Sequence, residues 1–84
     1  MRQFTVYTIP NCPWCSMVKD RLKYYAEQFY EENLDTPEKL REWAKRYPGL
    51  KTMPQVFMHD QGGDTIHVGG YTETVEFLTR SEPQ

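Results

Sequence analysis

Cys12 and Cys15 are the only cysteines in the chain, and Pro13 and Trp14 separate them. Pro13 suits the first position of a helix, so the pattern predicts a helix that begins directly after Cys12. The Cys12 sulfur would then lie beside free backbone N–H groups at the positive end of the helix dipole. Cysteines in such positions have pKa values of roughly 3.5 to 7.5, against about 8.5 for a free thiol. We therefore expect Cys12 to be a nucleophilic thiolate.

The second thiol differs because Cys15 shares an apolar helical stripe with Val18 and Leu22. Cys12 would attack a disulfide sulfur to form a mixed disulfide, and Cys15 would release the product by closing a Cys12–Cys15 bond. A purely structural disulfide across so small a loop would stabilise the fold little. Trp14, at the edge of the stripe, is expected to be exposed and to contact substrate, although a core position is the alternative.

Two other uses of the cysteine pair stay open as lesser alternatives. A zinc site would need two more ligands, and the only histidines, His59 and His67, flank a turn with a spacing unlike familiar zinc modules. The cysteines could also be inert core residues. Their spacing and helical context favour redox chemistry over both alternatives, and no bound metal is expected.

Composition narrows the class of protein further. The 84 residues suit one domain, residues 1–84, with 38% hydrophobic residues and a net charge of -2. The basic residues are scattered among acidic ones, which argues against nucleic acid as a partner. The chain has no run of 18 apolar residues and no signal-peptide pattern at its start, so we expect a cytoplasmic protein without a membrane partner. One small domain with mixed surface charge suggests a monomer.

Periodicity predicts the elements that position the cysteines. Residues 2–8 alternate as a strand, and the helix after Cys12 carries apolar residues as far as Ala26. Residues 28–34 fit a strand or a helix, and we favour a strand. Thr36 is expected to cap a second helix that Pro48 and Gly49 stop, and Thr72 a third. The remaining runs, 54–58 and 65–69, predict a hairpin.

Three segments, NCPWC (11–15), TMPQVF (52–57) and VGGYTE (68–73), occur in the order and spacing of a known family. In them the chain resembles the dithiol glutaredoxins, the glutathione-coupled branch of the thioredoxin-like proteins. The resemblance spans nearly the whole chain. With the element order β-α-β-α-β-β-α, it implies an α/β thioredoxin-like fold in which three helices flank a four-stranded mixed sheet.

The resemblance also implies roles for individual residues. Cys12 matches the nucleophile and Cys15 the resolving cysteine, while Pro13 tunes the redox properties of the pair. Met53-Pro54 matches a cis-proline dipeptide beside the thiols, whereas an ordinary trans proline would be the expectation without the family. Residues matching the glutathione site are Trp14, Thr52, Met53, Pro54, Gly70, Tyr71, Thr72 and Glu73, with Arg41 matching a position near the glycine carboxylate of glutathione.

The implied activity is glutathione-dependent reduction of protein disulfides and glutathione mixed disulfides, with ribonucleotide reductase as one recipient. Many glutaredoxins carry Lys or Arg three residues before the nucleophile, where this chain has Ile9. One alternative is therefore a thioredoxin-like redoxin recycled by thioredoxin reductase. Another is a module that binds zinc or an iron–sulfur cluster, which Pro13 disfavours because family members with proline there generally do not assemble a cluster.

Overall fold

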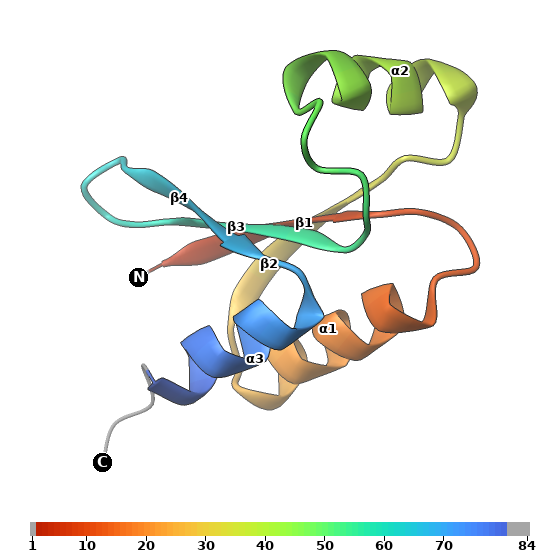
Figure 1. The fold of residues 1–84 in the computed structure, drawn as a ribbon. Coiled ribbons are helices and arrows are strands. Elements are labelled where there is room, and N and C mark those ends of the chain that lie inside the picture. Colours follow the sequence, from red (N-terminus) through yellow and green to blue (C-terminus); the bar gives the residue numbers. More distant parts are fainter. Residues whose placement is uncertain (1, 81–84) are drawn as a thin grey trace.

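The computed structural model describes residues 2–80, which form four strands in one mixed sheet and three helices (Figure 1). The strand order is β2-β1-β3-β4, with β1 and β2 parallel and the other pairs antiparallel. The predicted α/β fold, a four-stranded mixed sheet with three helices, is confirmed. The elements are β1 (Gln3–Thr8), α1 (Pro13–Tyr24), β2 (Gln28–Asn33), α2 (Pro37–Arg46), β3 (Gln55–His59), β4 (Thr65–Gly69) and α3 (Tyr71–Arg80).

Helices α1 and α3 cover one face of the sheet, and α2 lies over the other (Figure 1). Along β1, buried residues alternate with more exposed ones, because successive side chains point to opposite faces of the sheet. Phe4 and Val6 point toward α1 and α3, where they are buried with Leu22 and Leu78. This core fixes α1, and with it the cysteines, against the end of β1.

The opposite face is covered by the aromatic residues of α2 and the sheet. Trp43 packs between Tyr7 and Tyr47, and its Nε1 donates a hydrogen bond to the carbonyl of Leu50 at 2.8 Å. The Thr36 hydroxyl accepts from the Lys39 N–H at 3.2 Å, which confirms the predicted cap. None of the helices within residues 2–80 is long and apolar enough to cross a membrane.

The segment that fitted both a strand and a helix is strand β2, which pairs in parallel with β1 from Gln28 to Asn33. Pairing along β1 satisfies its backbone groups, which periodicity alone could not show. The sequence placed the start of the next strand at Pro54, but β3 begins at Gln55. Pro54 has no backbone N–H to donate to the neighbouring strand, which explains why the strand begins one residue later.

Two helix ends differ from the sequence prediction. Helix α1 ends at Tyr24, and Ala26 lies outside it in the left-handed region, with φ of 56°. The N–H groups of Ala26 and Glu27 bond to the carbonyls of Lys23 and Leu22 at 3.0 and 2.9 Å, as in a Schellman motif. The apolar stripe predicted this end wrongly because Ala26 continues the pattern without continuing the helix.

The cap predicted for the last helix is also wrong. Helix α3 begins at Tyr71, so Thr72 is inside the helix and Gly70 precedes it. The Glu73 side chain reaches back instead, and its Oε1 accepts from the Gly70 N–H at 2.9 Å. This contact is half of a capping box, in which the third helical residue satisfies the N–H before the helix.

We predict that Ala26→Gly stabilises the protein and that the same substitution at Ala44 destabilises it. Glycine adopts positive φ without the steric cost of a Cβ, so the gain at position 26 should be about 0.5 to 1 kcal/mol. Ala44 lies within α2, where glycine should cost about 0.5 to 1 kcal/mol. Thermal unfolding followed by circular dichroism measures both shifts, and a lower melting temperature for Ala26→Gly would contradict the assignment.

Candidate active site

A short loop carries the chain from β1 to the first cysteine. Asn11, in this loop, has φ of 58°, a region that asparagine tolerates better than most residues. Cys12 follows as the N-cap of α1, with extended backbone angles of φ −119° and ψ 100°. Its Sγ accepts a hydrogen bond from the Cys15 N–H at 3.2 Å. The reactive sulfur therefore occupies the place where capping side chains usually put an oxygen.

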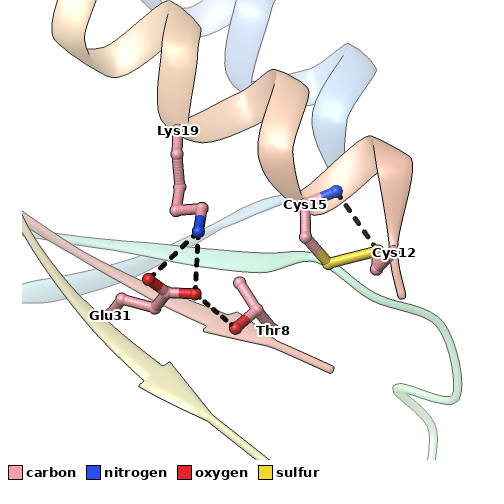
Figure 2. Close-up of polar contacts among 5 residues, drawn as sticks. All are labelled: Thr8, Cys12, Cys15, Lys19 and Glu31. Carbon is pink, nitrogen blue, oxygen red and sulfur yellow. Dashed lines mark hydrogen bonds and ion pairs between the residues drawn. A yellow bond between two sulfur atoms is a disulfide. The ribbon is translucent and has the colours of Figure 1, made fainter. Parts of the chain in front are cut away.

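The two cysteines are joined in a disulfide but differ in their surroundings (Figure 2). Their Cα atoms are 5.2 Å apart, and Pro13 is the first helical residue between them. Cys15 is 3% exposed, whereas Cys12 is only partly buried. A disulfide substrate can therefore approach the Cys12 sulfur more easily than the Cys15 sulfur.

The Met53–Pro54 dipeptide lies directly beside the disulfide. Its peptide bond is cis, as the resemblance implies. The Met53 carbonyl oxygen is 3.8 Å from Cys12 Sγ, which brings the start of β3 against the start of α1. The backbone before Pro54 is thus close enough to pair with a ligand attached to Cys12.

A cavity of about 190 Å³ opens beside this dipeptide. Trp14 is 54% exposed at its rim, and its ring centroid is 5.4 Å from that of Tyr71. The cavity brings together three segments that are far apart in the sequence. Its lining residues are Trp14, Thr52, Met53, Pro54, Gly70, Tyr71, Thr72 and Glu73, the residues that the resemblance associates with glutathione.

The glycines before α3 shape one wall of this cavity. Gly69 has φ of 129°, and a Cβ at that position would lie 2.7 Å from the Glu73 Cβ. The Gly70 N–H donates a hydrogen bond to the Glu73 carboxylate. The N-terminus of α3 therefore forms part of the cavity wall, and the N-terminal end of a helix favours a carboxylate ligand.

Arg41 does not line this cavity. It is an exposed residue of α2, and its Nη2 is 3.7 Å from Glu38 Oε2 within the same helix. Ile9, which stands where many glutaredoxins have a cation, packs against the cluster of Leu34, Trp43 and Phe57. No cation therefore reaches the cysteines from position 9.

On the other side of the disulfide lies a polar cluster that the sequence patterns did not predict. Lys19 Nζ is 3.1 and 3.0 Å from the two carboxylate oxygens of Glu31, and the Thr8 hydroxyl donates to Glu31 Oε2 at 2.7 Å (Figure 2). The hydrogen bond from Thr8 and the charge of Lys19 hold the pKa of Glu31 below its usual value. One signal was available: Glu31 follows Phe29 by two residues, so both share the inward face of β2.

The described residues 2–80 contain no group of three or more His, Cys, Asp or Glu side chains placed to hold a metal ion. His59 bonds to Thr5 and Thr65, and His67 bonds to Gln55. Within this part of the chain the histidines therefore act in local hydrogen bonds of the sheet.

Comparison with known proteins identifies the family. The glutaredoxin family model matches residues 4–62. Glutaredoxin 1 of Rickettsia conorii is 37% identical over 67 residues, covering 77% of this chain and 61% of that protein. The glutaredoxin of Neisseria meningitidis is 36% identical over 75 residues, covering 87% of this chain and 81% of that protein. The chain belongs to the glutaredoxin family, although it spans less than two thirds of the length of relatives such as the Rickettsia protein.

Solved structures share the fold. Glutaredoxin 1 from Francisella tularensis, complexed with cacodylate, has a TM-score of 0.74 at 23% identity and 95% coverage of both chains. The glutaredoxin-like NrdH-redoxin from Escherichia coli has a TM-score of 0.63 at 23% identity, covering 98% of this chain and 97% of that one. At these identities the likeness concerns the fold.

We predict that alkylation of the reduced protein distinguishes the two thiols. At about pH 6, Cys12 should react at least roughly tenfold faster than Cys15, because helix amides stabilise its thiolate and its sulfur is more accessible. Mass spectrometry of peptides after timed quenching gives both rates. In the Cys12→Ser variant Cys15 is the only remaining cysteine, and its alkylation should be slow throughout. Equal alkylation rates for the two thiols of the unmodified protein would contradict the assignment.

Proposed function

We propose that this chain is a glutathione-dependent thiol–disulfide oxidoreductase. The observation that carries the proposal is the pairing of a partly exposed Cys12, held at the N-terminus of α1, with a buried Cys15 beside the cavity described above. Membership of the glutaredoxin family supports the same conclusion.

In the proposed reaction, the Cys12 thiolate attacks a disulfide and forms a mixed disulfide with one half of it. For a protein disulfide, Cys15 then attacks Cys12 and releases the reduced protein. For a glutathione mixed disulfide, Cys12 takes up the glutathionyl group, and a second glutathione releases it as glutathione disulfide. Glutathione also reduces the Cys12–Cys15 disulfide and so restores the enzyme.

The cavity offers contacts for the cysteinyl and γ-glutamyl parts of glutathione. The Met53 backbone can pair with the cysteinyl residue in the manner of an added strand. The N-terminus of α3 favours the γ-glutamyl carboxylate, and the Glu73 carboxylate favours the neighbouring ammonium group. Trp14 and Tyr71 supply flat apolar surface at the rim.

Turnover of a glutathione mixed disulfide tests the two cysteine roles. With glutathione, glutathione reductase and NADPH, Cys12→Ser should reduce activity to background, because the remaining thiol, Cys15, is buried and is poorly placed to form the mixed disulfide. Cys15→Ser should retain this activity and lose reduction of protein disulfides. Appreciable turnover by Cys12→Ser would refute the assignment.

Glu73→Gln tests the glutathione site separately. The amide oxygen of glutamine can still accept from Gly70, while the charge opposite the glutathione ammonium group is lost. A charge-assisted hydrogen bond contributes about 1.5 kcal/mol at the low end, so KM for glutathione should rise roughly tenfold with little change in kcat. Glu76→Gln, an exposed change on the same helix, is the control. An unchanged KM would remove Glu73 from the site.

A second candidate function is that of a redoxin recycled by thioredoxin reductase. Ile9 favours it, since one cation that could assist glutathione is missing. The NrdH-redoxin from Escherichia coli, which shares the fold, is described as having a thioredoxin-like activity profile. The test measures the rate at which this protein reduces one protein disulfide, first with glutathione and glutathione reductase and then with thioredoxin reductase. The system that supports the faster rate decides between the two functions. Ribonucleotide reductase is a suitable substrate for this comparison because the resemblance suggests it as a recipient.

A further inference from the structure

The ion pair of Lys19 and Glu31 lies on the face of the sheet that α1 covers. In the pairing of β1 with β2, Glu31 is the partner of Val6, so its side chain points to the same face as the buried Val6. A carboxylate on such a face is unusual unless it has partners. Here Lys19 from α1 and the buried Thr8 from β1 both bind it (Figure 2).

A polar hollow of about 550 Å³ connects this pair with the disulfide. Cys12 and Cys15 line it together with Thr8, Lys19 and Glu31, and water can occupy a space of this size. Glu31 is the only carboxylate among its lining residues, all of which lie in the described part of the chain. Figure 2 shows the Cys15 side chain pointing from α1 toward the strand that carries Thr8, with the ion pair beside it.

Cys15 needs a proton acceptor before it can react, whereas the helix amides already favour the thiolate of Cys12. The Cys15 thiol must lose a proton before the sulfur can attack the mixed disulfide on Cys12. Cys15 is 3% exposed and lies one turn inside α1, so bulk water has little access to it and the N-terminal amides favour Cys12 instead. The hollow is the polar route that leads away from this buried sulfur.

We propose that Glu31, through water in this hollow, accepts the proton that Cys15 releases, and that Lys19 and Thr8 are positioning residues for its carboxylate. The inference rests on the proposed dithiol reaction. In that step the Cys12–Cys15 bond forms, the bond between Cys12 and the substrate sulfur breaks, and the substrate leaves as a thiolate. Two electrons pass to the substrate, and the proton moves from Cys15 to Glu31 and then to solvent.

The groups that face Glu31 favour its ionised form. The Thr8 hydroxyl, the Lys19 ammonium group and the more distant charge of Lys23 all hold its pKa below the usual value, and these effects exceed the opposing effect of burial. Glu31 is therefore ionised at neutral pH and returns the proton to solvent rapidly. The pH dependence of the closing step then reflects Cys15 and not Glu31.

Ellman's reagent isolates this step without glutathione. Attack by Cys12 releases one coloured thionitrobenzoate, and closure by Cys15 releases the second, which leaves as a stable thiolate that needs no proton. Stopped-flow absorbance of the fully reduced protein thus gives the two steps as two phases. The proton on Cys15 is the one that must move in the second phase.

We expect Glu31→Gln to slow the second phase about tenfold near neutral pH, because general base catalysis contributes about 10² to 10⁴ when the pKa of the base lies near the operating pH and less for a more acidic carboxylate. The first phase should not change, and the second should recover as rising pH lets hydroxide remove the proton. Glu31→Asp should restore part of the rate. Glu32→Gln is the matched control, since it removes a neighbouring charge on the opposite face of the same strand.

An unchanged second phase in Glu31→Gln would overturn the inference, and so would equal slowing of both phases, which a general loss of packing would cause. If Glu31→Gln does not fold, Thr8→Val provides the second variant. It removes one hydrogen bond to the carboxylate and should slow only the second phase. Failure to turn over glutathione mixed disulfides, with the Glu31 dependence intact, would refute the proposed function and leave this inference standing.

Discussion

The hydrogen bond from the Cys15 N–H to Cys12 Sγ is the contact on which the site depends. It places the reactive sulfur at the one point of α1 where backbone donors have no partners within the helix. Because α1 starts at Pro13, Cys15 is the third residue of the helix and lies on its buried side with Val18 and Leu22. The start of one helix thus presents an accessible sulfur and a buried one from two residues of the same kind.

The disulfide separates two unlike environments. On one side, the cis dipeptide and the N-terminus of α3 form a cavity with donors suited to a carboxylate. On the other side, the ion pair of Lys19 and Glu31 lines a polar hollow against the sheet. Their side chains are 27% and 31% exposed, so the charges keep part of their hydration and the cost of desolvation is moderate. The exposed pairs on α2, such as Arg41 with Glu38, contribute little by comparison.

Much of the architecture was predictable because it rests on local rules. Alternation identified β1, the cap at Thr36 identified α2, and proline after Cys12 identified the start of α1. The errors have local causes as well. Ala26 extends the apolar stripe but leaves the helix through a Schellman motif, and Glu73 rather than Thr72 satisfies the N–H that precedes α3. In both cases two sequence signals competed, and hydrogen bonding at the helix end decided between them.

The candidate site also combines features that the local sequence sets with features that only the fold sets. The placement of Cys12 and Cys15 at the start of one helix is a short-range property, and the amino-acid sequence alone determines it. The resemblance named the residues around the cavity, but the fold brings three distant segments to one place. The approach of Lys19 and Glu31 to Cys15 was not predicted, because it depends on the register of β2 against β1 and on the rotation of α1 over the sheet. Those two quantities result from packing of the whole core, so only the tertiary structure could decide which charged groups lie beside the buried thiol.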